Sequence, residues 1–293
     1  MDLTQIFIQI VITGGSGFIG GYVYRHFKSL QHDVYNLDSV DNGIDKDEFF
    51  LKGSILDFDF LLHALKNVDV VFHFAGFSNI NLVKNAPREC LELNIIGTTN
   101  ILEVLRINKK GKLVLASSAY VQNEQKGHIY TTSKLSGELI CKDYFNLFGV
   151  TSLILRLGTV YGEYSRHQDV VSIFARSFAL NLPLTVHGDG LQQRNFIHGE
   201  DVGNACERIL KSNFKGLKTF FVAPKLETSI LELVELIKVH GDINVDIQKQ
   251  NIRAHDNSYS NKGEIYDTIE WEPSIGIEHG IIRLINYFKD NLK

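Results

Sequence analysis

The stretch Thr13-Gly14-Gly15-Ser16-Gly17-Phe18-Ile19-Gly20 lies directly between a short apolar run, Ile6–Ile12, and a helical pattern, Phe18–Ser29. Its glycines at positions 14, 17 and 20 have the spacing Gly-x-x-Gly-x-x-Gly. Glycines spaced in this way allow a sharp turn, a close approach of the backbone to a ligand, and tight packing of the next helix on the sheet. The first amides of that helix would face an anion. We therefore interpret the stretch as a strand, a phosphate-binding loop and a helix.

Apolar runs and helical patterns alternate along the first half of the chain. Further strands are predicted at Asp33–Leu37, Val68–Phe74, Lys112–Ala116 and Thr151–Leu157, and helices at about Pro87–Asn108 and at Thr131–Phe148. Continuous runs of Val, Ile, Leu and Phe separated by helices are typical of a parallel sheet that is covered on both faces. The predicted fold class is α/β, a doubly wound parallel (Rossmann) sheet with a smaller C-terminal substrate domain.

The pattern loosens after Tyr161, and 293 residues are more than one ordinary core needs. We expect residues 1–162 and about 196–222 to form the nucleotide-binding Rossmann domain. Residues of about 163–195 and 223–293 are expected to form the substrate domain. No linker rich in Pro, Gly or Ser lies between them, so the second domain is expected to be threaded from several segments.

Composition narrows the function classes. The net charge is −4 and the chain has no basic run, which argues against nucleic acid as a partner. No apolar stretch approaches the roughly 18 residues of a membrane span, and the N-terminus does not read as a signal peptide. The cysteines Cys90, Cys141 and Cys206 are far apart and have no metal-ligand spacing. They indicate thiols in a reducing cytoplasm, and no metal site is predicted.

Asp38 comes at the end of the second predicted strand, directly after Leu37, at the place where a dinucleotide-binding fold holds a ribose. A carboxylate there accepts hydrogen bonds from the ribose hydroxyls and repels a 2′-phosphate, so it favours NAD over NADP. The segment Phe74-Ala75-Gly76 follows another strand with small residues, where a backbone can pass close to the cofactor. The predicted cofactor is NAD.

Tyr130 and Lys134 lie four residues apart and so share one face of the helix that begins there. An ammonium group near a phenol favours the phenolate and lowers the pKa of the tyrosine, as a proton shuttle requires. Ser117 and Ser118 follow an apolar strand, and a serine there can hydrogen-bond the substrate oxygen on which Tyr130 acts. The expected NAD-binding residues are Gly14, Gly17, Phe18, Ile19, Gly20, Asp38, Phe74, Ala75, Gly76, Tyr130 and Lys134.

Together these motifs resemble the extended short-chain dehydrogenase/reductase family, in its NAD-dependent epimerase/dehydratase branch acting on nucleotide sugars, such as the UDP-sugar 4-epimerases. The resemblance extends through residues 94–98, 156–162, 188–202 and 269–273. It implies an enzyme in which Ser118, Tyr130 and Lys134 are the catalytic residues. It also implies a homodimer built from the two long helices, Pro87–Asn108 and Tyr130–Phe148.

The resemblance implies substrate contacts by Ser118, Thr159, Arg194 and Arg253, where the two arginines would bind the diphosphate of a UDP-sugar. A salt bridge within the protein is an alternative role for both arginines. His198 and Asp201 flank the start of a predicted helix, where Asp201 is a candidate N-terminal cap.

Two departures from the family pattern bear on the reaction. Dehydratases of this family carry Asp-Glu after the catalytic serine or threonine, and Ala119 and Tyr120 stand there in this chain. Only eleven residues separate Ser118 from Tyr130, in a connection that usually helps to form the sugar pocket.

The leading hypothesis is a 4-epimerase, in which a hydride leaves C4 of the sugar and returns to the opposite face. A 4-keto-sugar reductase that consumes NAD(P)H uses the same residues, and Asp38 argues against NADPH. A non-catalytic NAD-binding regulatory protein is a third hypothesis, against which the Ser-Tyr-Lys set argues. The identity and redox state of any bound dinucleotide distinguish the three.

Overall fold

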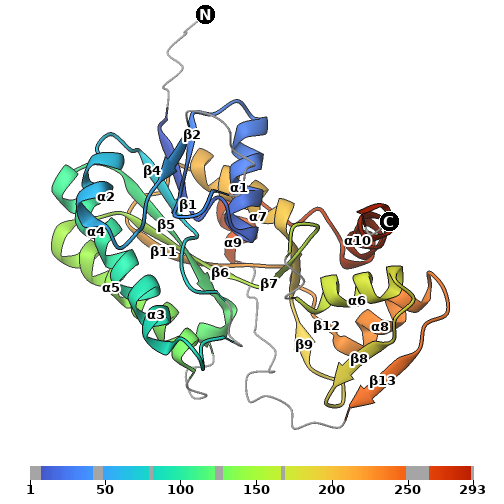
Figure 1. Ribbon diagram of the computed structural model, residues 1–293. Coiled ribbons are helices and arrows are strands. Elements are labelled where there is room, and N and C mark those ends of the chain that lie inside the picture. The colour runs from blue at the N-terminus through green and yellow to red at the C-terminus, as the bar shows by residue number, and fades with distance from the viewer. Residues whose placement is uncertain are drawn as a thin grey trace, which may run out of the picture.

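The structure is a computed structural model that describes residues 8–41, 49–78, 82–122, 128–165, 169–248 and 264–291. Within these residues, a parallel sheet of seven strands has the order β11-β6-β5-β4-β1-β2-β3 (Figure 1). The strands are β1 (Ile10–Thr13), β2 (Val34–Asp38), β3 (Phe50–Lys52), β4 (Val70–His73), β5 (Lys112–Ser118), β6 (Ser152–Leu157) and β11 (Leu217–Val222). The strand order changes direction between β1 and β4, and open α/β sheets bind ligands at the carboxyl ends of strands at such a point. The predicted doubly wound α/β fold is confirmed.

Helices cover both faces of the sheet (Figure 1). On one face lie α1 (Phe18–Ser29), α7 (Gly199–Lys211) and α9 (Glu264–Ile269). On the other lie α2 (Phe58–Ala64), α4 (Gly97–Asn108) and α5 (Ile129–Phe148). Strands β1 and β4 are buried along their whole length, which explains why their sequences are apolar up to the last residue, Thr13 or His73, and do not alternate. Burying each large aliphatic side chain stabilises the fold by roughly 1.5–3 kcal/mol.

The long helix predicted at about Pro87–Asn108 is interrupted. It consists of α3 (Pro87–Leu91), a π-helical turn η1 (Glu92–Ile96) and α4. Apolar periodicity does not detect such a turn, because one extra residue displaces the pattern only locally. π-turns inside α-helices are frequent at functional sites.

A second apolar cluster holds the C-terminal part of the chain together. It is formed by α6 (Val170–Ala179), β8 (Leu184–His187), α8 (Ile230–Lys238) and α10 (Ile277–Asn291), with Tyr161 and Phe196. Strand β13 (Val245–Gln248) pairs with β8. Between α6 and α8 the chain returns to the large sheet through α7 and β11 (Figure 1). We propose that the chain forms the two domains predicted from the sequence, and that it crosses between them in this region.

Several short strands were not predicted. They are β7 (Thr159–Tyr161), β9 (Gln193–Arg194), β10 (Phe196–His198), β12 (Thr228–Ser229) and β13. Each spans two to four residues and pairs with one partner in a two-stranded ladder. Strands this short show no recognisable alternation, because the pairing partner and not the local sequence decides their conformation.

Candidate active site

The glycine loop is folded tightly against the end of β4. Gly14 has φ +76°, and a Cβ atom there would lie 2.6 Å from the backbone nitrogen of Ala75. A Cβ atom at Gly20 would overlap the carbonyl oxygen of Gly14. Gly17 precedes α1 and contributes no side chain to cap it. The first-turn amides of α1 are therefore available to an anion, as the sequence predicts.

Asp38 connects the glycine loop to the end of β2. Its Oδ2 accepts a hydrogen bond from the backbone N–H of Ser16 at 3.1 Å, and its Oδ1 accepts one from Val40 at 3.1 Å. These bonds hold the carboxylate at the carboxyl end of the sheet, beside the loop. A ribose hydroxyl that binds there would meet a preorganised acceptor.

One cavity of about 480 Å³ at this edge of the sheet brings the predicted residues together. All eleven residues expected to bind NAD line it, and so does Ser118. The loop geometry, the uncapped start of α1 and the Asp38 carboxylate fit a dinucleotide. The other lining residues are Leu37, Ser39, Gly53, Ser54, Ile55, Ser78, Leu93, Ala116, Ser117, Leu157, Gly158, Val160, Ser165 and Asp169.

Tyr130 and Lys134 enter this cavity from the first turns of α5. The Lys134 ammonium donates a hydrogen bond to the carbonyl of Ala116 at 3.0 Å and lies 6.0 Å from the centroid of the Tyr130 ring. Burial lowers the pKa of Lys134 to about 8. Burial also raises the pKa of Tyr130 to about 12, an effect that a hydrogen bond with Ser118 opposes. The expectation of a lowered tyrosine pKa is therefore wrong for this structure, because desolvation of the phenol raises it.

The two adjacent serines have different surroundings. Ser117 donates a hydrogen bond to Oε1 of Glu138 at 2.5 Å, and Glu138 pairs with Arg156 at 2.7 Å. Ser118 accepts the backbone N–H of Tyr120 at 3.3 Å and shares a hydrogen bond with Tyr130. Adjacent residues of a strand point to opposite faces, so only Ser118 is placed beside the phenol.

Asn94 supports the start of α5 from the π-turn. Its Oδ1 accepts the backbone N–H of Phe77 at 2.8 Å, and its Nδ2 donates to the carbonyl of Phe77 at 3.0 Å and to Oγ of Ser133 at 2.8 Å. Ser133 donates in turn to the carbonyl of Tyr130 at 2.7 Å. Sequence reasoning noted residues 94–98 as a family motif and missed this role.

His73 carries a second hydrogen-bond chain beneath the cavity. Thr13 bonds its Nδ1 at 2.7 Å, and its Nε2 lies 3.1 Å from Oγ1 of Thr98. Thr98 donates to the carbonyl of Asn94 at 2.8 Å, so it accepts the His73 Nε2–H. Burial, and then the charge of Lys134, lower the pKa of His73 to about 3. A neutral imidazole therefore connects β1 to α4.

A model of the NAD dependent epimerase/dehydratase family matches residues 10–223, well over half of the 293 residues. The chain belongs to this family. The protein is therefore an NAD-dependent enzyme, and the predicted family, cofactor and enzyme class are confirmed.

The names of the relatives of this protein state different reactions. It is 31% identical, over 97% of its length and 99% of the relative, to "Putative UDP-glucose 4-epimerase" of Methanocaldococcus jannaschii. It is 25% identical, over 97% of its length and 89% of the relative, to the dTDP-D-glucose 4,6-dehydratase of Bos taurus. The solved UDP-glucose 4-epimerase of Thermotoga maritima with UDP-glucose shares its fold, with a TM-score of 0.89 and 21% identity over 98% of this chain and 100% of that one.

Not all of the residues that were predicted to contact the substrate line the cavity. Thr159 and Arg194 are half-buried and do not line it, although Gly158 and Val160 beside Thr159 do. Arg194 donates from a guanidinium nitrogen to the carbonyl of Gln193 at 3.2 Å. Arg253 lies outside the described residues. The roles of these three residues stay predictions.

Ser165 and Asp169 line the cavity and were missed by sequence reasoning. The Asp169 carboxylate caps α6 by accepting the N–H of Ser172 at 2.8 Å, and it also accepts the Ser165 hydroxyl. Burial raises the pKa of Asp169. An aspartate directly before a helical pattern is a recognisable capping signal, and it would have placed this residue at the start of α6.

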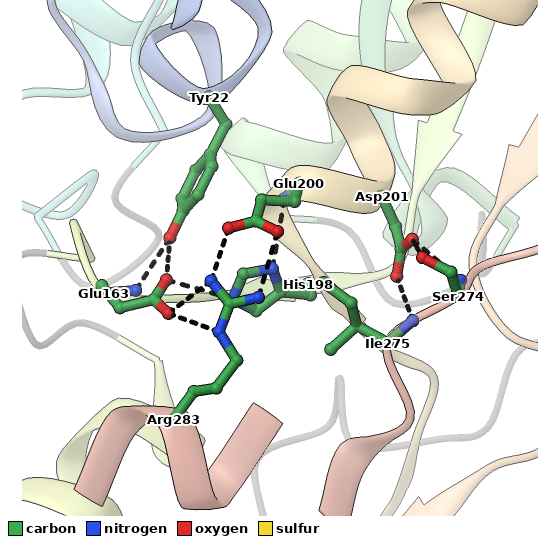
Figure 2. A network of polar contacts seen from close by, with 8 residues as sticks. All are labelled: Tyr22, Glu163, His198, Glu200, Asp201, Ser274, Ile275 and Arg283. Carbon is green, nitrogen blue, oxygen red and sulfur yellow. Dashed lines mark hydrogen bonds and ion pairs between the residues drawn. The ribbon is translucent and has the colours of Figure 1, made fainter. Parts of the chain in front are cut away.

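Figure 2 shows a network of charged groups that begins two residues before Ser165. Glu163 accepts hydrogen bonds from the hydroxyl of Tyr22 at 2.6 Å and from Arg283 Nε at 3.0 Å. Arg283 also pairs with Glu200. Hydrogen bonds from His198 and Tyr22 outweigh burial and lower the pKa of Glu163 to about 2.

The helix α7 starts differently from the sequence expectation. His198 Nδ1 accepts the backbone N–H of Glu200 at 3.2 Å, so His198 and not Asp201 caps the helix. Asp201 instead accepts the backbone N–H and the hydroxyl of Ser274, both at 2.8 Å, and the backbone N–H of Ile275 at 3.0 Å (Figure 2). The carboxylate therefore fastens the segment that leads into α10.

The possible metal ligands in this network have another partner. Glu163, His198 and Glu200 place one ligand atom each within 4.8 Å of one another. The guanidinium of Arg283 bonds both carboxylates (Figure 2). Because its positive charge already pairs with the two acids, we interpret the group as an ion-pair network.

Proposed function

We propose that this enzyme is a nucleotide-sugar 4-epimerase whose substrate is a UDP-sugar. One observation carries the proposal: Ser118, Tyr130 and Lys134 line the same cavity as every residue expected to hold NAD. This set is sufficient for removing and returning a hydride and a proton at one carbinol carbon. The relative from Methanocaldococcus jannaschii that is named "Putative UDP-glucose 4-epimerase" supports the same reaction.

The mechanism assigns each residue one task. Tyr130, as the phenolate, takes the proton of the 4-hydroxyl, and Ser118 donates a hydrogen bond to the same sugar oxygen. Lys134 stabilises the phenolate by its positive charge. Bound NAD supplies acceptance of the C4 hydride and its return. After the 4-keto sugar has turned over in the pocket, Tyr130 gives the proton back to the oxygen, so that protons and electrons balance over one cycle.

Dehydration needs carboxyl groups near Ser118, and the described residues that line this cavity offer none directly after it. The short helix η2 (Ala119–Gln122) follows Ser118 and carries no acid. Among the described lining residues, only Asp38 and Asp169 have carboxyl groups. Asp38 is bound to the glycine loop, and Asp169 caps α6. Because both carboxylates already accept hydrogen bonds from the protein, this lining favours epimerisation over dehydration.

Two measurements on freshly purified protein test the proposal. After denaturation, we expect the released dinucleotide to be NAD at close to one molecule per chain. With no cofactor added, we expect the folded protein to interconvert UDP-glucose and UDP-galactose. A protein that binds NADPH in preference to NAD and converts only 4-keto sugars would contradict the epimerase and favour the reductase.

We also propose that the enzyme is a homodimer formed through α4 and α5. These helices lie side by side on one face of the sheet (Figure 1) and carry exposed apolar side chains. Ile140 and Phe145 are half-buried, whereas Leu139 is 52% and Leu147 is 72% exposed. Sedimentation equilibrium of wild type and of Leu139→Glu/Leu147→Glu tests the interface: a dimer that becomes monomeric supports it, and a monomeric wild type contradicts it.

We propose a cytoplasmic location, because the state of the three cysteines is the one expected in a reducing compartment. Cys90, Cys141 and Cys206 are all free and buried, as expected where disulfides do not form. Burial raises the pKa of Cys141 to about 12 and also raises the pKa of Cys206, so these thiols have little thiolate character. None of the described helices is long and apolar enough to cross a membrane.

A further inference from the structure

The ring of Tyr22 occupies a slot between two glycines that are far apart in sequence. A Cβ atom at Gly199 would overlap the Tyr22 ring, and one at Gly162 would overlap its hydroxyl. Gly162 also has φ +154°, a conformation that side chains disfavour. Tyr22 belongs to α1, the helix that begins at the cofactor loop. The Phe18 ring, which lines the cavity, packs edge-on against Tyr22 with centroids 5.7 Å apart.

Tyr22 holds Glu163 by both its main chain and its side chain. The Tyr22 hydroxyl donates to Oε2 of Glu163 at 2.6 Å and accepts the backbone N–H of the same residue at 2.8 Å. Arg283 from α10 binds the other carboxylate oxygen, and His198 donates its Nε2–H to Oε2 at 3.1 Å (Figure 2). The Glu163 side chain is thus bound from the cofactor helix, from the start of α7 and from the C-terminal helix.

The residues that follow Glu163 form one wall of the cavity. The backbone N–H of Ser165 bonds the carbonyl of Gly162 at 3.1 Å and closes a tight turn. Ser165 is 4% exposed, lines the cavity and donates its hydroxyl to Asp169, the cap of α6. The place of Ser165 and Asp169 therefore depends on how the turn at residues 162–165 is held.

We propose that Glu163 is a positioning residue for the sugar-nucleotide side of the active site. It holds the turn at residues 162–165 against the cofactor helix through Tyr22, and so sets where Ser165 and the start of α6 stand relative to bound NAD. The substrate named in this proposal rests on the proposed function. The positioning of the turn at residues 162–165 by Glu163 does not. Glu163 itself does not line the cavity, so it acts through Ser165 and Asp169.

Charged and polar groups surround the Glu163 carboxylate, and two substitutions remove these contacts to different extents. The facing groups are the Arg283 guanidinium, the His198 imidazole, the Tyr22 hydroxyl and, beyond Arg283, the Glu200 carboxylate. Replacing Glu163 by glutamine keeps the shape of the side chain. It removes the negative charge that orders these donors. Tyr22→Phe is the milder change, because the ring stays between the glycines and only the hydroxyl bonds are lost.

The test uses the full-length, NAD-containing enzyme as wild type, Glu163→Gln, Tyr22→Phe and Tyr144→Phe. The last variant is a matched control, since Tyr144 also donates its hydroxyl to a glutamate, Glu103 at 3.1 Å, away from the cavity. Two quantities are measured: hydrogen–deuterium exchange of residues 162–179, and kcat and KM for UDP-glucose. NAD content and Tm are recorded for each variant.

We expect Glu163→Gln to raise KM about tenfold and Tyr22→Phe to raise it about threefold, as for the loss of one or two charge-assisted hydrogen bonds, with kcat nearly unchanged. Both variants should exchange faster over residues 162–179 and keep their NAD, while Tyr144→Phe matches wild type in both readouts. A lower Tm with unchanged KM and unchanged exchange would overturn the proposal. If wild type acts on no nucleotide sugar, the epimerase fails, and the exchange measurement alone then decides the positioning role.

Discussion

The Lys134 ammonium lies 6.0 Å from the centroid of the Tyr130 ring and donates its hydrogen bond to the carbonyl of Ala116. In the proposed mechanism Lys134 therefore acts on the phenol through space, as a positive charge that the strand β5 holds nearby. Tyr130 is buried and Lys134 is half-buried. Desolvation favours the neutral form of both groups, with a pKa of about 8 for Lys134 and about 12 for Tyr130. We predict that phenolate formation depends on the charge of Lys134.

A fall in activity at alkaline pH follows from this arrangement. Lys134 is charged below pH 8 and neutral above it, because its pKa is lowered to about 8. We expect kcat/KM for UDP-glucose to fall as the pH rises through about 8. Lys134→Arg keeps its charge at all these pH values, and its alkaline fall should move upward by more than one pH unit even if its maximal rate is lower. An alkaline limb at the same pH in both proteins would contradict this role of Lys134.

The adjacent serines offer a matched pair of variants. Ser118→Ala removes the hydroxyl beside Tyr130 and should lower kcat about a hundredfold, as for loss of a donor to a reacting oxygen. Ser117→Ala removes a donor to Glu138. It should lower the free energy of unfolding by about 1–2 kcal/mol and change kcat less than threefold. The measurements are steady-state kinetics and urea unfolding, and equal losses of kcat in the two variants would be the contrary result.

A substitution in the glycine loop should cause a selective loss of the cofactor. Gly14→Ala places a Cβ atom 2.6 Å from the backbone of Ala75 at a positive φ, so the loop must move. We expect the purified variant to contain less than about a tenth of the wild-type NAD. Gly276→Ala is the control, because a Cβ atom there meets nothing within 4 Å. Wild-type NAD content in Gly14→Ala would show that this turn does not shape the cofactor site.

The lowered pKa of His73 implies that the folded protein loses stability in mild acid. Its pKa is lowered from 6.5 to about 3 in the folded protein, so the unfolded chain binds the extra proton between these values. Stability is therefore complete above pH 6.5 and falls as the pH decreases toward 3. Between pH 7 and pH 5 we expect the free energy of unfolding to fall by about 2 kcal/mol from this group. Urea unfolding at both pH values measures the fall, and in His73→Gln, which starts less stable, the pH dependence should be smaller by that amount.

Much of the cofactor half of the site follows from local sequence. The loop at residues 13–20, the acid at Asp38 and the pair Tyr130–Lys134 each occupy a fixed place relative to a strand or a helix. The parallel sheet brings those places to one edge. All the residues expected to bind NAD consequently line one cavity. The choice of Ser118 over Ser117 was available too, since neighbouring residues of a strand face opposite ways.

The rest depends on contacts between distant segments. Tyr22 and Glu163 are 141 residues apart, and nothing in either local sequence predicts that they meet. The π-turn at residues 92–96 inserts one residue into a helix without changing its apolar character, so the role of Asn94 was not visible. The direction of the Tyr130 pKa shift also required the structure, because burial of the phenol raises that pKa.

The central claim is that one hydride leaves C4 and returns to the same carbon. Incubating the purified protein, with no cofactor added, with UDP-glucose that carries deuterium at C4 tests it directly. We predict UDP-galactose that retains the deuterium at C4, in a reaction that Tyr130→Phe slows by a factor on the order of a thousand. UDP-galactose without the label, label at another carbon of the sugar, or no conversion of any UDP-sugar would contradict the account.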